Sequence, residues 1–250
     1  MKPDQDGTST VDKDAIAHFA RLAGEWWDPR GPMGALHKLN PVRVGYIRNH
    51  AAAQFGHDPA RLDSLAGLRI LDIGCGGGVL SEPLARLGAS VVAIDPAENN
   101  VAAARHHAEQ SGLTIDYRAT TAEALAQRGE TFDVVLAMEV VEHVADFNLF
   151  IEVAAALVKP GGLMFVATLN RTLRSFALAI VGAEYILRWI PRGTHQWDKF
   201  ITPDELEIAL AQSGLSVIDQ TGVIYNLLAD RFQLAADMAA NYMMVAEKAA

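Results

Sequence analysis

The chain carries two carboxylates and an imidazole within one short stretch, at Glu139, Glu142 and His143. If a helical turn begins at Glu139, their spacings of three and four residues place all three side chains on one face. Carboxylate oxygens suit Mg²⁺ or Mn²⁺, whereas an imidazole favours softer ions. The same groups could instead supply a general base, or form a polar cap that only organises a loop. From the residues alone, the metal site, the base and the loop stay open as alternatives.

A second chemical signal is the glycine-rich stretch that follows residues 69–73. Residues 74–78 contain four glycines, which remove side chains where a backbone turns tightly and a ligand can approach it. The G-x-G-x-x-G fingerprint of dinucleotide-binding enzymes needs a third glycine where this chain has Val79. The pattern is instead D-x-G-x-G-x-G, beginning at Asp72, and Asp95 ends the next expected strand, where a carboxylate can accept hydrogen bonds from ribose hydroxyls. We therefore predict a nucleotide-type cofactor site, the alternative being a plain tight turn followed by a helix cap.

Bulk properties narrow the class of protein. A length of 250 residues suits one large domain with decorations. The formal net charge of -9 and the isoelectric point near 5.3 argue against nucleic acid as a partner and favour a small-molecule substrate. Cys75 is the only cysteine, so no intrachain disulfide can form, and no base beside it marks it as a nucleophile. With a polar stretch at residues 1–14, a cytoplasmic location is expected.

The elements that must position these groups alternate from residue 68 onward. Strands are expected at 69–73, 90–94, 114–118, 132–138 and 162–168, with helices near 79–87, 98–111, 121–128 and 146–158. A helix from Thr202 to Gly214 precedes two final strands at 215–222 and 243–248, which a long, partly helical connection joins. Such alternation predicts an α/β fold with a mostly parallel sheet of about seven strands and helices on both faces.

Two segments lie outside this alternation. Residues 1–66 are expected to form a helical extension that packs on a domain of residues 67–250, with one helix over 12–27 and another starting at Asn40-Pro41. Residues 170–200 form a long insertion whose net charge is +3, against -12 for the remainder. A basic, apolar insertion on an acidic protein predicts either a peripheral contact with an anionic lipid surface or a lid packed on the catalytic domain. No segment reaches the roughly 18 uninterrupted apolar residues of a membrane span.

At these motifs, residues 65–168 resemble the class I S-adenosylmethionine-dependent methyltransferases, which have a Rossmann-like fold. The resemblance implies that Gly74 and Gly76 approach the methionine part of the cofactor and that Asp72 supports its amino group. It places the ribose on Asp95. Three further cofactor positions follow from the same resemblance, namely Thr121, Ala122 and Met138. The loop at 119–123 lacks the usual Asp-Ala pair beside adenine.

A closer resemblance, to the ubiquinone biosynthesis O-methyltransferases, extends outside the cofactor motifs. Its residues are N-P-V-R-V-G-Y-I at 40–47, E-V-V-E-H-V at 139–144, T-L-N-R at 168–171, V-G-A-E-Y-I-L at 181–187, G-T-H at 193–195, K-F-I at 199–201 and N-Y-M at 241–243.

This resemblance implies O-methylation of a polyprenyl catechol (2-polyprenyl-6-hydroxyphenol) and of a 3-demethylubiquinol. It implies a divalent cation, most simply magnesium, on Glu139, Glu142 and His143, and a cofactor contact from Arg43. A ubiquinone biosynthesis complex and the inner face of the membrane are the expected partners of an enzyme with that activity. His195 is a second-rank candidate for the general base. The alternatives are a methyltransferase for another small acceptor and a non-enzymatic, cofactor-binding assembly subunit.

Overall fold

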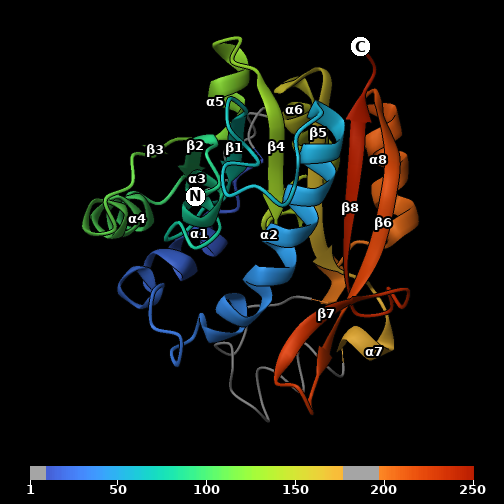
Figure 1. Ribbon diagram of the computed structural model, residues 1–250. Coiled ribbons are helices and arrows are strands. Elements are labelled where there is room, and N and C mark those ends of the chain that lie inside the picture. Colours follow the sequence, from blue (N-terminus) through green and yellow to red (C-terminus); the bar gives the residue numbers. More distant parts are fainter. Residues whose placement is uncertain (1–9, 177–196) are drawn as a thin grey trace, which may run out of the picture.

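The computed structural model describes residues 10–176 and 197–250, which form a layered α/β fold around one sheet (Figure 1). Within these residues the sheet has eight strands in the order β3-β2-β1-β4-β5-β8-β6-β7. The strands are β1 (Arg69–Ile73), β2 (Ser90–Asp95), β3 (Asp116–Ala119), β4 (Phe132–Met138), β5 (Val158–Leu169), β6 (Leu215–Asn226), β7 (Arg231–Ala235) and β8 (Asn241–Lys248).

The first five strands are parallel, and β8 inserts antiparallel between β5 and β6. Successive residues of the parallel strands contribute to opposite faces, as Ile70 and Leu71 do. Both faces are covered, which explains why these strands are almost continuously apolar. The prediction of a class I, Rossmann-like fold is confirmed.

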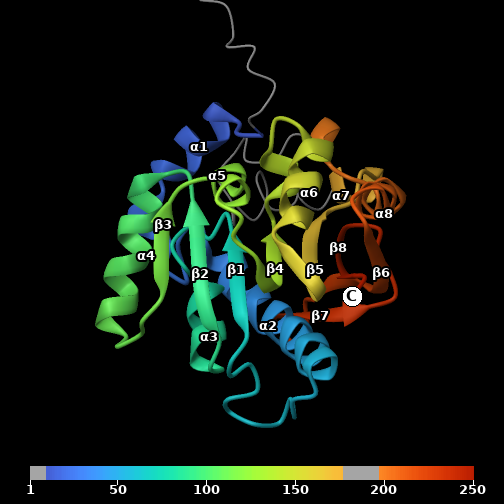
Figure 2. The same cartoon turned by 90° about the horizontal axis from the view of Figure 1, so that it is seen from above.

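Among the described residues, helices cover both faces of the sheet (Figure 2). One face packs against α2 (Gly34–Phe55), α3 (Ser81–Arg86) and α4 (Glu98–Gln110), and the other against α5 (Ala122–Gln127), α6 (Phe147–Ala156) and α8 (Pro203–Gln212). Since α2 shares the core beneath β1 and β5, the N-terminal extension is joined to the sheet by apolar packing. Whether residue 66 divides two domains stays a prediction.

The start of α2 differs from the prediction. The helix begins at Gly34, so Asn40 is not its cap and Pro41 lies inside it. Asn40 is buried, and its side-chain amide donates a hydrogen bond to the carbonyl of Val79 at 2.8 Å. Tertiary contacts have therefore overridden a local cap signal. The expected helix over 12–27 is also shorter, consisting of α1 (Lys13–Ala20) and the short 3-10 helix η1 (Ala23–Glu25).

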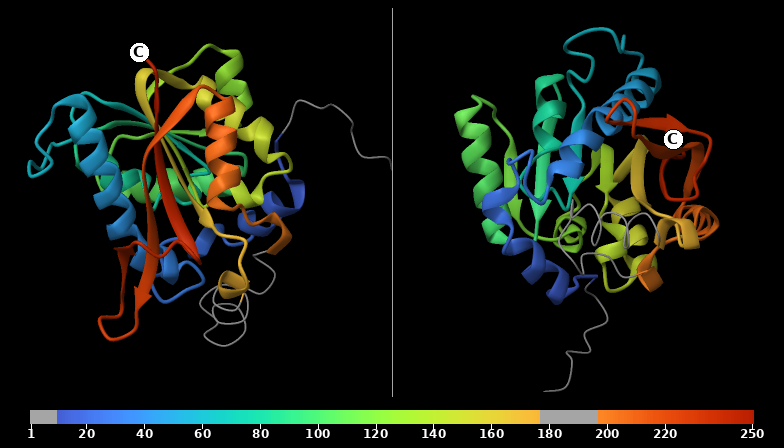
Figure 3. Two further views of the ribbon diagram at one scale, coloured as in Figure 1. Left: turned by 90° about the vertical axis from the view of Figure 1, so that its right-hand side faces the viewer. Right: turned by 90° about the horizontal axis from the view of Figure 1, so that it is seen from below.

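The connection between the last two expected strands was predicted wrongly. It is not helical: β6 continues to Asn226 and pairs with β7 in an antiparallel hairpin that extends beyond the end of the sheet (Figure 3). The Asn226 side chain accepts hydrogen bonds from the backbone N–H groups of Leu228 and Ala229, both at 3.1 Å, and so closes the turn locally. This hairpin adds the edge strand that the sequence did not indicate.

Residues 10–12 contact the segments that follow the carboxyl ends of the strands. The backbone N–H and hydroxyl of Thr10 donate to Glu123 at 2.7 and 2.6 Å, and the Thr10 carbonyl accepts from the N–H of Ala145 at 2.8 Å. Lys199 reaches the Asp12 carboxylate at 2.6 Å. Residues 10–12 therefore cross the edge where cofactors bind in open α/β sheets.

No helix in the parts of the chain described here is long and apolar enough to cross a membrane.

Candidate active site

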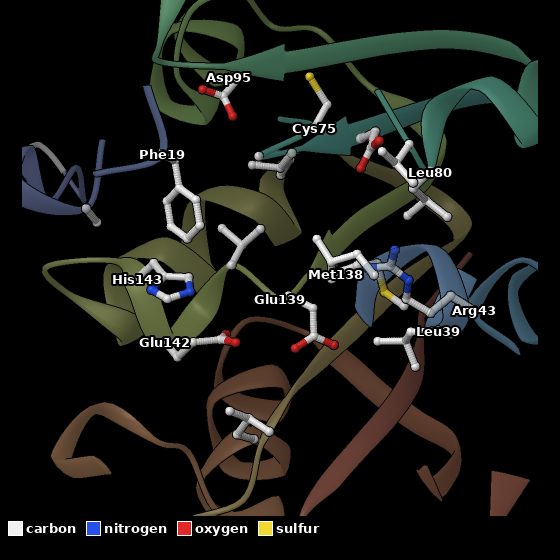
Figure 4. Close-up of a pocket in the computed structure, with 18 of the residues that line it drawn as sticks. Phe19, Leu39, Arg43, Cys75, Leu80, Asp95, Met138, Glu139, Glu142 and His143 are labelled. Atoms are coloured by element: carbon white, nitrogen blue, oxygen red, sulfur yellow. The ribbon is translucent and has the colours of Figure 1, made fainter. Parts of the chain in front are cut away.

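A cavity of about 570 Å³ lies at the carboxyl ends of β1, β2 and β4, beneath the N-terminal segment. Figure 4 shows side chains from these three strands, from α2 and from α1 converging on it. Of the residues proposed from the sequence for the cofactor or the acceptor, His195 lies outside the described part of the chain, and the other eleven belong to elements around the cavity. Ten of these line it directly, and Gly76 does not. The structure thus gathers the predicted site residues in one place.

The glycine turn is held against the neighbouring strand. The backbone N–H groups of Gly74 and Cys75 donate to the Ile94 carbonyl at 2.8 and 3.0 Å. Gly74, Gly76 and Gly78 have φ values of 70°, 53° and 83°, in the left-handed region that favours glycine. A Cβ at Gly74 would also lie 2.6 Å from a methyl carbon of Val140, so the chain can leave β1 in this way only with a glycine there.

Asp95, at the end of β2, is tied to this turn. One carboxylate oxygen accepts from the N–H of Gly76 at 3.0 Å, and the other accepts from the N–H of Ala97 at 2.8 Å and the amide of Asn100 at 3.2 Å. Burial raises the pKa of the Asp95 carboxyl, and these hydrogen bonds oppose that rise. The side chain is thus part of the turn and also borders the cavity.

Asp72 is the second carboxylate of the cofactor half. It is buried in β1 and accepts a hydrogen bond from the Ser81 hydroxyl at 2.6 Å. Burial raises the pKa of Asp72 to about 6, although the hydroxyl and the positive charge of Arg43 favour the ionised form.

Arg43 projects from α2 and is almost completely buried, with 4% of its surface exposed. Its Nη2 donates to the side-chain oxygen of Asn40 at 3.0 Å, and no group in the described chain accepts from its Nε. Burial lowers the pKa of the guanidinium, while the nearby carboxylates of Glu139 and Asp72 favour its charge. The charge of Arg43 therefore interacts with Asp72 in the cofactor half of the site and with Glu139 in the acceptor half.

Glu139 follows β4 directly and has φ 61°, unusual for a residue with a side chain. Its N–H donates to the Ala167 carbonyl at 2.9 Å, and its carboxylate accepts from the Asn241 amide at 3.3 Å. The helical turn expected to begin at Glu139 does not form. Within residues 139–144, helical structure is limited to the 3-10 turn η2 (Val141–His143). The left-handed backbone at Glu139 nonetheless turns its carboxylate into the cavity (Figure 4).

Glu142 lies buried beside Glu139. The Thr168 hydroxyl donates to its Oε2 at 2.9 Å, while its buried Oε1 has no hydrogen-bond partner among the described residues. Burial and the negative charge of Glu139 together raise the pKa of the Glu142 carboxyl to about 8. Two carboxyl groups this close retain a proton between them unless a cation or a hydrogen-bond donor joins them.

His143 takes a different place from the two carboxylates. Its ring meets the Phe19 ring edge to face, with centroids 5.1 Å apart. In the residues that the structure describes, no group of three or more His, Cys, Asp or Glu side chains is arranged to hold a metal ion. The three residues predicted as one ligand set are therefore not gathered as such a set, although all three line the cavity. His195 lies outside the described residues.

Thr121, Ala122 and Met138 also line the cavity. Thr121 caps α5 by accepting from the N–H of Ala124 at 3.4 Å. Sequence reasoning missed Trp26, Asn100 and the part that Asn241 plays beside Glu139. Asn241 stood in a recognised motif, but no spacing rule places Trp26, which is 74 positions from its partner Asn100.

Comparison with known proteins places this geometry in a family. Residues 45–220 match the model of a methyltransferase domain. Over 240 residues the chain is 60% identical to the ubiquinone biosynthesis O-methyltransferase of Chelativorans sp. (strain BNC1), covering 96% of this chain and 95% of that protein. The enzyme of the same name from Rhodopseudomonas palustris (strain BisA53) is 61% identical over 241 residues, with the same coverage.

The chain belongs to the ubiquinone biosynthesis O-methyltransferases. The predicted S-adenosylmethionine-dependent methyltransferase activity and the family resemblance are both confirmed. In fold, this O-methyltransferase is similar to magnesium protoporphyrin IX methyltransferase from Synechocystis PCC 6803 crystallised with bound S-adenosylmethionine. The TM-score is 0.62 at 17% identity, over 97% of this chain and all of the other.

Changing Gly76 to Ala should destabilise this methyltransferase more than the same change at Gly112. Both glycines have positive φ, which costs about 1–2 kcal/mol for alanine. A Cβ at Gly76 would also lie 2.3 Å from the Trp26 ring, whereas Gly112 has open space around it. Urea denaturation should give a loss for Gly76→Ala that exceeds that of Gly112→Ala by about 1–3 kcal/mol. Equal losses would mean that the ring moves aside freely.

Changing Asp72 to Asn should stabilise the ligand-free enzyme at pH 7.5. The folded-state pKa of about 6 lies above the ordinary 3.8, so above pH 6 the buried carboxylate costs up to about 3 kcal/mol. This cost disappears as the pH falls through the window from 6 to 3.8. The difference between variant and wild type in free energy of unfolding should therefore be large at pH 7.5 and small near pH 4.5. A gain that does not change with pH would contradict the raised pKa.

Proposed function

We propose that this enzyme transfers the methyl group of S-adenosylmethionine to a phenolic oxygen of a polyprenyl catechol, 2-polyprenyl-6-hydroxyphenol, and of a 3-demethylubiquinol. The observation that carries the proposal is the pair of close carboxyl groups, Glu139 and Glu142, in the same cavity as the glycine turn and Asp95. The names of the relatives supply the pathway, and the carboxyl pair supplies the chemistry that a phenolic acceptor needs.

The acceptor half contains two buried oxygens that have no hydrogen-bond partner among the described residues. Oε1 of Glu142 and Oδ1 of Asn241 are both buried, and neither finds a partner within the described chain. A buried acceptor without a donor is costly, at about 1–3 kcal/mol. The two adjacent hydroxyls of a catechol would supply donors to such a site. This need explains why a diphenol suits the site better than an acceptor without O–H groups.

Proton removal is the chemical task of the same pair. A phenol has a pKa around 10 and is mostly protonated at neutral pH, so a carboxylate within reach can accept its proton as the new bond forms. The phenolic oxygen then attacks the methyl carbon, the bond between carbon and sulfur breaks, and a neutral thioether leaves. Holding the two reactants in line supplies much of the acceleration, and a positioned base typically adds about 10²–10⁴-fold.

We propose a divalent cation as a further ligand of the carboxyl pair, although the described His, Cys, Asp and Glu side chains form no group of three arranged to hold one. With Glu139 and Glu142 both ionised, the two carboxyl groups would offer oxygen ligands of the kind that Mg²⁺ prefers. Glu139 and Glu142 would hold the ion, with His143 on the same short segment as a third candidate. When bound, the ion would lower the pKa of the acceptor hydroxyl.

The cofactor half assigns separate parts of S-adenosylmethionine to separate residues. We place the ribose on Asp95 and the adenine beside Thr121 and Ala122. The methionine part would lie along the turn at Gly74 and Gly76. The bonds that already hold Asp95 to Gly76, Ala97 and Asn100 support this role, because they fix the carboxylate before the ligand arrives.

Asp72, Arg43 and Met138 would surround the reacting sulfonium end. Asp72 supports the amino group of the cofactor, and Arg43 balances the charge of Asp72 and Glu139. Met138 ends β4, one residue before Glu139, and would contact the cofactor where its methyl group meets the acceptor.

A peripheral contact with an anionic membrane surface, at its inner face, accompanies this substrate class, since a polyprenyl tail resides in lipid. The described flanks of the 170–200 insertion support it by exposing Leu173, Phe176 and Trp197. Leu227 and Leu228 at the tip of the β6–β7 hairpin are exposed as well. Apolar side chains at a surface are what an interfacial segment inserts. A ubiquinone biosynthesis complex is a further proposed partner.

The double change Glu139→Ala and Glu142→Ala should abolish methylation while preserving cofactor binding. With a short-chain polyprenyl catechol, the variant should lose at least about 10²-fold in kcat. Calorimetry with S-adenosylhomocysteine should give an unchanged Kd, because neither residue is assigned to the cofactor. Glu152→Ala, an exposed glutamate on α6, is the matched control and should keep full activity.

Running the same assay with a chelator, and again after adding back Mg²⁺, separates the cation from the base. Loss and recovery of activity support the cation, and activity that a chelator leaves intact points to the carboxyl pair acting as base alone. Lost cofactor binding in the double variant would contradict the division of roles. Failure of the wild type to methylate any polyprenyl catechol would favour another small acceptor.

Intact protein should co-sediment with vesicles rich in anionic lipid at low salt, and release should follow as salt rises, because screening weakens the attraction. Vesicles of zwitterionic lipid alone are the control and should retain less protein. Absence of co-sedimentation at low salt would remove the lipid contact from the proposal.

A further inference from the structure

Trp26 lies against the glycine turn from the N-terminal side. Trp26 is 8% exposed, and its side chain occupies the space where side chains at Gly76 and Gly77 would otherwise lie. A Cβ on Gly76 would lie 2.3 Å from Cη2 of Trp26, and one on Gly77 would lie 2.3 Å from its Cβ. The two glycines are thus needed to admit the tryptophan as well as to turn the chain.

The indole also makes a buried polar contact. Nε1 of Trp26 donates to Oδ1 of Asn100 at 3.0 Å, and the amide nitrogen of Asn100 donates to Oδ1 of Asp95 at 3.2 Å. Asn100 is 1% exposed and Asp95 is 7% exposed. A chain of two hydrogen bonds therefore connects residue 26 of the N-terminal segment to the carboxylate at the end of β2.

The direction of this chain is fixed by the chemistry of its members. An indole N–H can only donate, so it engages the oxygen of the Asn100 amide and leaves the NH₂ group to face Asp95. Asp95 favours the same orientation, because a turned amide would present its oxygen to the carboxylate. Without the indole N–H, the Asn100 oxygen would lose its donor, and the amide would be held less firmly against Asp95.

The Asp95 carboxylate keeps capacity for a ligand while it is held. Oδ1 accepts from Ala97 and Asn100, whereas Oδ2 accepts only from Gly76 in the described structure. A carboxylate oxygen can accept two hydrogen bonds, so Oδ2 retains one position. Asn100 and the backbone thus occupy one oxygen and leave the other for a hydroxyl.

We propose that Trp26 is a positioning residue of the cofactor site, acting through Asn100 on Asp95 to set the affinity for the ribose of the cofactor. The proposal rests on the ribose-binding role proposed for Asp95. It makes the N-terminal segment a determinant of cofactor affinity, through a hydrogen bond rather than through coverage of the cavity alone.

The variant Trp26→Phe removes the donor and keeps an aromatic ring against the turn. Its affinity for S-adenosylhomocysteine, measured by calorimetry, should fall by about tenfold. Affinity for 5′-methylthioadenosine, which has the ribose and adenine but no amino-acid part, should fall by the same factor. A defect of the glycine turn would instead lower the affinity for S-adenosylhomocysteine more than the affinity for methylthioadenosine.

Trp27→Phe is the matched control. The Trp27 indole donates to the carbonyl of Gly77 at 2.8 Å and its ring stacks on His107 at 3.5 Å, so it touches the same turn without a hydrogen bond to Asn100. Its affinity for methylthioadenosine should stay within about twofold of wild type. An equal loss in both variants would overturn the proposal, because general packing of the N-terminal segment would explain it.

A double-mutant cycle tests the connection itself. In an Asp95→Ala background, Trp26→Phe should cause no further loss, since residues in one network are not additive. Asn100→Ala should lose as much affinity as Trp26→Phe. It replaces the tryptophan variant in the test if thermal melts show that Trp26→Phe is poorly folded. Additive losses, or unchanged affinity in Asn100→Ala, would overturn the connection.

The two proposals fail in different ways. If Asp95→Ala weakens binding but Trp26→Phe does not, the positioning role of Trp26 is wrong and the role of Asp95 stands. If Asp95→Ala leaves binding of S-adenosylhomocysteine unchanged, the assignment of the ribose is wrong, and the connection from Trp26 is wrong with it.

Discussion

The buried guanidinium of Arg43 interacts with carboxylates on both sides of the cavity. These are Asp72, in β1 just before the glycine turn, and Glu139, directly after β4. A buried charge is tolerated only where opposite charge and hydrogen bonds compensate it. The two carboxylates partly compensate the charge of the guanidinium, and α2 holds the guanidinium between them. Asn40, one turn away on the same helix, accepts from Arg43 and binds the chain at Val79, so α2 and the turn are fixed together. The N-terminal extension is therefore part of the site.

Sheet topology explains why the two halves of the site meet. β1 pairs with β2 on one side and β4 on the other, all parallel, so three carboxyl ends open at one edge. The glycine turn follows β1, Asp95 ends β2, and Glu139 follows β4, which brings a cofactor half and an acceptor half into one cavity. Residues 10–12 cross this edge and form part of the wall of the cavity. A methyl donor and a phenolic acceptor held there would face each other across the end of β4.

The sequence predicts where residues lie when local spacing marks the end of a strand. The glycine turn, Asp95 and the acidic segment after β4 follow from strand ends that neighbouring residues reveal. Prediction failed where distant parts of the chain decide: Asn40 read as a cap because its contact with Val79 was not visible, and β7 was hidden because a hairpin needs its partner strand. Glu139 could not be placed either, since its left-handed backbone replaces the expected helical turn. The connection from Trp26 to Asp95 depends on side chains 74 positions apart.

The most direct measurement is a crystal structure of the enzyme with S-adenosylhomocysteine bound. We predict that the ribose hydroxyls lie within hydrogen-bond distance of Asp95. The amino-acid part should lie along Gly74 and Gly76, and the sulfur should point toward Glu139 and Glu142. A ribose placed away from Asp95, or a sulfur that faces away from the two glutamates, would contradict the assignment of one half of the cavity to the methyl donor and the other to the acceptor.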